Sequence, residues 1–158
     1  MFSNTETPIY TLTTYIAALA LVILTIRNWI NHRHNPNVQG SIKFLALFSL
    51  WAVCISLWLA TDDATWRLFF LKLSFFSTCL MPVEWLTFAH EFARQPSLPK
   101  VRKWLFFGIP LVTQALIWSN SFHHLFWRDE IRAAIMPWWS TPITVYGPWF
   151  WIHTAYSY

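Results

Sequence analysis

Residues 42–60 have the sequence IKFLALFSLWAVCISLWLA, and this stretch decides the class of fold. Lys43 is its one charged residue. A helix of about 20 mostly apolar residues is long enough to cross the ~30 Å hydrocarbon core of a bilayer. The stretch therefore predicts a membrane-spanning helix.

The composition of the whole chain agrees with a membrane location. Of its 158 residues, 11% are charged and 20% are aromatic. Soluble domains carry about 25% charged residues, so this chain has too little polar surface to coat a water-soluble globule. Its aromatic content excludes intrinsic disorder, and its two cysteines, Cys54 and Cys79, exclude a disulfide-rich scaffold. An integral membrane protein remains.

Further apolar runs lie on both sides of this stretch. We expect membrane spans at about residues 10–30, 42–60, 66–93 and 104–119, and the opening turns of a fifth span at residues 148–158. The predicted fold is an all-α membrane bundle of four transmembrane helices plus the start of a fifth. No basic segment precedes the first run and no small-residue cleavage site follows it, so we interpret it as a helix and not as a signal peptide.

The connection between the fourth and fifth spans, residues 120–146, is polar and aromatic. Trp127, Ile131, Ile135 and Trp138 lie near i, i+4 spacing, which is typical of a short helix at the membrane interface. The stretch STPITVY, which ends this connection, alternates more like a strand. The pattern leaves both forms open.

The basic residues of the loops predict the orientation in the membrane. The first and third loops together hold seven of them: Arg27, Arg33, Lys43, Arg94, Lys100, Arg102 and Lys103. The opposite side holds three: Arg67, Arg128 and Arg132. Cytoplasmic loops are enriched in Lys and Arg, so we expect the N-terminus to lie outside the cell membrane and the protein to be multi-pass.

Lys72 and Glu84 lie well inside the third predicted span, where charge is expensive and by default marks a functional site. Lys72 and Glu84 are about 18 Å apart along one helix, so they cannot pair with each other. We expect Lys72 to extend its ammonium group toward the interface. Glu84 is a candidate for binding a ligand or a proton, unless it lies near the inner headgroups.

Histidines and aromatic residues gather in the outer connection and the fifth span. His123 and His124 are adjacent there and lie beside Trp127. Zinc sites need three or four ligands at defined spacing, so we expect these rings to order the connection and not to bind metal. His153 on the fifth span can reach them, and all three histidines can respond to pH. No cofactor is expected.

Catalytic patterns are missing from the sequence. His90 and Glu91 open a zinc-protease pattern, but Arg94 stands where the second histidine ligand is needed. No Ser-His-Asp set, Gly-rich phosphate loop or CxxC motif is present. We therefore assign no catalytic residue, and we do not expect this chain by itself to be an enzyme. Its basic residues lie in small groups between apolar runs, which does not favour binding of nucleic acid.

Two stretches carry a resemblance to a known family. They are IPLVTQALIWSNSFHHLFW and GPWFWIHTAYSY, which resemble the N-terminal seven-transmembrane region of sensor histidine kinases. The matching positions are Pro110, Asn120, His123, His124, Leu125, Phe126, Trp127, Gly147, Pro148, Phe150, Trp151, His153, Tyr156, Ser157 and Tyr158. A weaker match in MPVEWLTFAHEFAR covers Pro82, Trp85, Phe88, Ala89, Glu91 and Phe92.

The resemblance implies a signal-input module of a two-component system, placed before a cytoplasmic kinase or output domain. The chain departs from the family pattern because helices six and seven, most of helix five and any kinase motif are missing, so we expect a partial region spanning residues 1–158. Candidate sensing residues are His123, His124, Trp127, Trp151, His153 and Glu84. The expected partners are the lipid bilayer, the parent kinase or output domain and, in a dimer, a second copy. The alternative is a fragment of a membrane transporter or channel.

Overall fold

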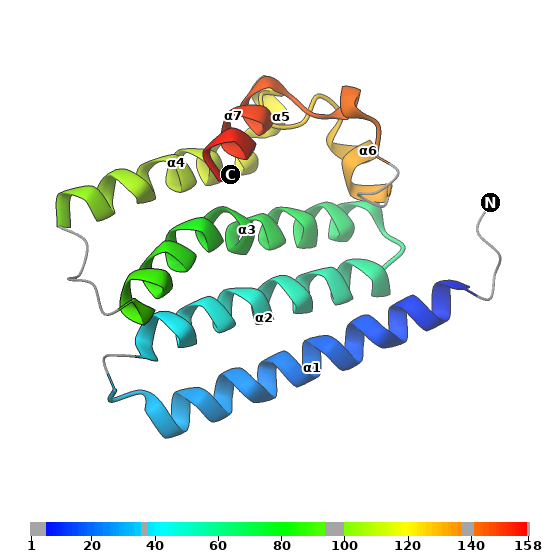
Figure 1. The fold of residues 1–158 in the computed structure, drawn as a ribbon. Helices are drawn as coiled ribbons and strands as arrows, with labels where there is room; N and C mark the ends of the chain where they lie inside the picture. Colours follow the sequence, from blue (N-terminus) through cyan, green and yellow to red (C-terminus); the bar gives the residue numbers. More distant parts are fainter. Residues whose placement is uncertain (1–5, 36–37, 94–99, 137–140, 158) are drawn as a thin grey trace.

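The structure, a computed structural model, describes residues 6–35, 38–93, 100–136 and 141–157. The long helices are α1 (Glu6–His32), α2 (Gln39–Ala60), α3 (Ala64–Phe92) and α4 (Lys100–Trp118). The shorter elements are α5 (Asn120–His123), α6 (Glu130–Ile135), the 3-10 turn η3 (Ile143–Val145) and α7 (Pro148–Ser157). Figure 1 shows α1, α2, α3 and α4 stacked side by side, each running back along its predecessor.

Within the described residues, three helices are long and apolar enough to cross a membrane. Their spans are Thr11–His32, Gln39–Ala60 and Ala64–His90, and a further apolar stretch, Phe106–Trp118, is shorter. The predicted helical membrane fold is therefore confirmed, while the number of spans stays a prediction.

Small polar side chains join α1 to α2 inside the bundle. The hydroxyl oxygens of Thr25 and Ser49 lie 2.7 Å apart. Seven residues further along α2, Ser56 donates a hydrogen bond to the carbonyl of Thr14 at 3.3 Å. Interhelical hydrogen bonds of this kind hold membrane helices together where lipid supplies no hydrophobic driving force.

A tight turn joins α2 to α3. Asp63 caps α3, because its Oδ1 accepts hydrogen bonds from the backbone N–H groups of Trp66 at 3.0 Å and Thr65 at 2.8 Å. These bonds, chiefly that from Trp66, lower the pKa of the Asp63 carboxyl below its usual value. Arg67 closes the turn, since its guanidinium lies 5.4 Å from the centre of the Trp58 ring.

The bundle has two distinct ends. The start of α1, the α2–α3 turn and α6 gather at one end of the bundle, whereas α1 and α3 end, and α2 and α4 begin, at the other end (Figure 1). This arrangement separates the loops in the way that the charge argument requires. Which end faces the cytoplasm stays a prediction.

Candidate functional site

The connection from α4 to α7 is compact, and we call residues 119–136 and 141–147 the cap. The cap contains α5, α6 and η3. Of the two forms that the sequence left open, a short helix is present at Glu130–Ile135, whereas the stretch that alternates like a strand gives η3 and, among the described residues, an isolated antiparallel bridge between Trp127 and Tyr146. Trp138 lies outside the described residues.

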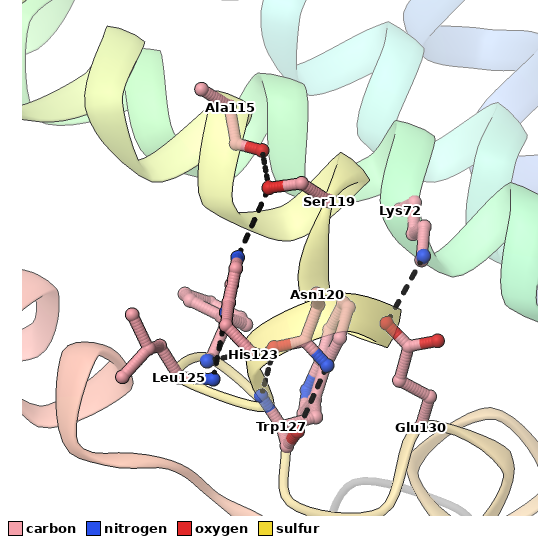
Figure 2. Close-up of polar contacts among 9 residues, drawn as sticks. Lys72, Ala115, Ser119, Asn120, His123, Leu125, Trp127 and Glu130 are labelled. Carbon is pink, nitrogen blue, oxygen red and sulfur yellow. Dashed lines mark hydrogen bonds and ion pairs between the residues drawn. The ribbon is translucent and has the colours of Figure 1, made fainter.

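Asn120 is the hydrogen-bonding centre of the cap. Its side chain is fully buried one residue after the Ser119 turn that ends α4. The Nδ2 group donates to the carbonyl of Trp127 at 2.8 Å, and Oδ1 accepts from the N–H groups of Phe126 at 2.8 Å and Trp127 at 3.0 Å. Figure 2 shows the Asn120 amide directed at the Trp127 backbone. One amide therefore satisfies three buried backbone groups of the returning chain.

Backbone hydrogen bonds tie this returning chain to the start of α7. Arg128 donates to the carbonyl of Val145 at 2.8 Å, and Gly147 donates to that of Phe126 at 2.8 Å. Trp149 donates to the carbonyl of Leu125 at 2.9 Å. The position at which α7 begins is thus fixed by the segment that Asn120 holds.

Gly147 is required by close backbone approach. A Cβ atom at this position would lie 2.2 Å from the carbonyl oxygen of Leu125 and 2.8 Å from that of His124. Both atoms belong to the backbone, so no side-chain rotation relieves the contact. Each residue of the Gly-Pro pair at the start of α7 therefore has its own role. Gly147 lets two backbone segments approach closely, and Pro148 suits the first position of a helix.

Aromatic rings fasten the cap to α3. Phe126 and Trp127 are buried in one cluster with Cys79 of α3 and Ile117 of α4. The ring of Phe75 on α3 meets both of them edge-on, with centroid distances of 5.1 Å to Phe126 and 5.2 Å to Trp127. Edge-to-face pairs of this kind add stability beyond the area they bury.

The cap also makes an ion pair with α3 that was not expected. Lys72 Nζ lies 3.1 Å from Glu130 Oε1, and both side chains are almost entirely buried (Figure 2). The prediction that Lys72 extends toward the interface was wrong, because a carboxylate on α6 reaches it inside the protein. Beside this pair, Trp58 Nε1 donates to the carbonyl of Ala134 at 2.6 Å. Glu130 and Ala134 thus anchor α6 to α3 and α2.

His123 is held by hydrogen bonds at both ring nitrogens. Nδ1 accepts from the N–H of Leu125 at 3.0 Å, and Nε2 lies 3.0 Å from Ser119 Oγ. Ser119 donates its own proton to the carbonyl of Ala115 at 2.7 Å, so its oxygen accepts from Nε2 (Figure 2). This geometry fits a neutral ring that carries its proton on Nε2. The neighbouring His124 is exposed and has a left-handed backbone with φ 52°.

His153 lies away from the cap histidines. Its Nδ1 is 3.2 Å from Thr113 Oγ1 on α4, and the same hydroxyl accepts a hydrogen bond from Trp149 Nε1 at 2.9 Å. The expectation that His153 reaches His123 and His124 is therefore not met. Thr113 instead attaches two consecutive turns of α7 to α4.

Tyr156 completes the attachment of α7 to α4. Pro110 has no N–H, so it leaves the carbonyl of Phe106, four residues earlier, without its helical donor. Tyr156 Oη donates to that carbonyl at 2.7 Å. A proline inside a membrane helix is tolerated where a neighbour satisfies the freed carbonyl, and Tyr156 does so here.

Two other sequence candidates lie outside this hydrogen-bonded unit. Trp151 is 46% exposed and contacts the rings of Phe150 and Tyr146. Glu84 is buried on α3, about 18 Å along the helix axis from Lys72, and its Oε2 has no hydrogen-bond partner among the residues that the structure describes. The cap does not include it.

The residues that join the elements of the cap were not predicted from the sequence. Asn120 is a position of the family resemblance, whereas Thr113 and Glu130 were not among the candidate residues. Asn120 had one usable signal, because a polar amide directly after an apolar helix is a common way to satisfy a turning backbone. No local sequence pattern marks Thr113 or Glu130, because their partners are distant in sequence.

The chain matches the model of a known protein family. The model of the N-terminal 7TM region of histidine kinase matches residues 13–158. The chain belongs to this family. No curated protein and no solved structure matches it. Membership in the histidine kinase 7TM family confirms the resemblance seen in the sequence and assigns the apolar helices to a membrane sensory input region.

Proposed function

We propose that this 7TM-family chain is the signal-input module of a sensor histidine kinase in the cell membrane, with its N-terminus outside. The observation that carries the proposal is the cap, which connects α2, α3, α4 and α7 through buried polar contacts. Asn120 holds the cap at the end of α4, the Lys72–Glu130 pair attaches it to α3, and Gly147 leads from it into α7. A change at the cap therefore reaches several helices at once.

Signal transfer would be a shift between two packings of these helices. The docked state, seen here, has α7 attached to α4 through Trp149, His153 and Tyr156. These residues recur every three or four positions, so they form one face of α7. A stimulus that binds better to a second arrangement of the cap would populate the undocked state.

Six residues are proposed to respond to the stimulus: His123, His124, Trp127, Trp151, His153 and Glu84. Their surroundings differ, which gives them different roles. His124 and Trp151 are exposed and are reached by a ligand directly. Trp127 and His153 are buried in the contacts that the stimulus would alter. Glu84 offers an unpartnered oxygen to a proton or a polar ligand.

The chemical step belongs to a kinase or output domain in the parent protein, and we assign no catalytic residue to this chain. We propose that the lipid bilayer and the parent's cytoplasmic domain are its partners. A second copy in a dimer is the third partner that we propose.

Replacing the three candidate histidines by alanine, one at a time, tests the proposal. His123→Ala removes the acceptor for Leu125, and His153→Ala removes the link to Thr113. We expect each of these two to change autophosphorylation of the full-length kinase in nanodiscs by about fivefold or more, the range of ordinary allosteric coupling. His124→Ala, whose ring is exposed, is expected to act only on the response to an added stimulus.

The matched control is His32→Ala, because His32 is an exposed histidine at the opposite end of the bundle. It should leave autophosphorylation unchanged. If His123→Ala and His153→Ala behave like this control while the proteins remain folded, these two histidines have no part in signalling.

A further inference from the structure

The outward face of α6 combines apolar and basic side chains that nothing in the described protein covers. Ile131 is 63% exposed and Ile135 is 45% exposed, and they lie four residues apart on one side of the helix. Arg132 between them is exposed, as is Arg128 just before the helix. Neither arginine makes an ion pair among the described residues. A face of this composition is typical of a helix at a membrane surface.

The opposite face of α6 fixes how deep the helix lies. Glu130 pairs with Lys72, which is eight residues after the first residue of α3 and so about 12 Å along that helix. Ala134 accepts the hydrogen bond of Trp58, which is two residues before the end of α2. Trp58 and Lys72 both fall within helices suited to cross the membrane. The short helix therefore lies alongside the outer part of the spans and not above them.

We propose that the outward face of α6 is a binding site for an anionic phospholipid. Ile131 and Ile135 would contact the upper part of the acyl chains. Arg128 and Arg132 would donate hydrogen bonds to the phosphate oxygens, which a guanidinium matches in geometry and charge. The apolar pair and the basic pair thus fit the two chemical parts of one lipid molecule.

A lipid bound at this face could affect the position of α3 through the contacts of Glu130. The same turn of α6 that presents Arg132 and Ile131 to the bilayer carries Glu130, whose carboxylate holds Lys72 of α3. A lipid that shifts α6 would therefore act on the ion pair. The lipid site itself rests only on the membrane location of the chain and not on its proposed signalling role.

A fluorophore at residue 131 tests the site directly. The Ile131→Cys variant is labelled with bimane and placed in bilayers of phosphatidylcholine and phosphatidylglycerol, in which either lipid carries brominated chains that quench fluorescence. The native Cys54 and Cys79 are buried and compete little for the label. We expect brominated phosphatidylglycerol to quench bimane more strongly than its share of the bilayer predicts, by about tenfold in relative affinity.

Two arginine double variants decide whether the site is specific. Arg128→Gln with Arg132→Gln should remove the preference for phosphatidylglycerol. Arg27→Gln with Arg33→Gln makes the same change of charge at the other end of the bundle and should keep it. Equal quenching by the two lipids in the parent protein would overturn the proposal, and so would a preference that survives loss of Arg128 and Arg132. No kinase readout enters, so the outcome is independent of the signalling tests.

Discussion

Replacing Gly147 by alanine is expected to lower the free energy of unfolding by about 3 kcal/mol or more. The new methyl group would meet the carbonyl oxygen of Leu125 at 2.2 Å and its carbonyl carbon at 2.5 Å. The two backbone segments must separate, which stretches the hydrogen bonds from Gly147 to Phe126 and from Trp149 to Leu125. The rings of Phe126 and Trp127 then lose part of their packing.

The measurement is unfolding in mixed micelles with increasing dodecyl sulfate, followed by tryptophan fluorescence. Gly108→Ala is the matched control, because a Cβ atom there meets nothing within 4 Å and the residue lies inside α4. Alanine is favoured over glycine in a helix by roughly 1 kcal/mol, so this control should be neutral or stabilising. A Gly147→Ala protein as stable as the parent would contradict the cap geometry.

The second large effect is expected for Asn120→Ala. The change removes one donor and one acceptor and leaves the N–H groups of Phe126 and Trp127 and the carbonyl of Trp127 unsatisfied. Each buried group left without a partner costs about 1–3 kcal/mol, so we expect the three together to lower the free energy of unfolding by at least about 3 kcal/mol. Local opening of the cap is the cheapest way for the protein to rehydrate these groups.

Hydrogen exchange measured by mass spectrometry distinguishes this local opening from general unfolding. Exchange should accelerate at residues 125–128, while α1 and α2 keep their protection. Asn28→Ala is the control, because the exposed Asn28 side chain donates to the Leu24 carbonyl of its own helix. Unchanged protection of the cap in Asn120→Ala would show that the amide does not hold it.

Local pattern was sufficient to predict the long helices α1 to α4. The stretches around residues 42–60 and 66–93 predict α2 and α3 because a membrane helix must be apolar along most of its length. The local sequence is enough to recognise such a run. A proline inside a helix, such as Pro110, always leaves one backbone carbonyl in need of another donor. The sequence did not show that Tyr156, far along the chain, is the donor.

Local sequence patterns did not predict the contacts between segments that are distant along the chain. Lys72 looked like a residue that reaches for the interface because its neighbours in sequence are apolar. Its partner Glu130 is brought to it only when α6 folds back on α3. The prediction for His153 was wrong for a different reason. His153 lies close to the cap along the chain, and this closeness suggested a contact with His123. The helix geometry of α7 instead turns its ring to Thr113.

The central claim is that the state of the cap controls the kinase through the helices it touches. Charge reversal of the Lys72–Glu130 pair tests it most directly, by autophosphorylation of the full-length kinase in nanodiscs.

Lys72→Glu alone and Glu130→Lys alone each leave like charges facing each other in a buried site, a strongly destabilising change. We expect each to change the autophosphorylation rate by about fivefold or more, and the double variant, which restores an ion pair with the charges exchanged, to return most of the way to the parent rate. Single variants that remain folded and phosphorylate at the parent rate would contradict the account.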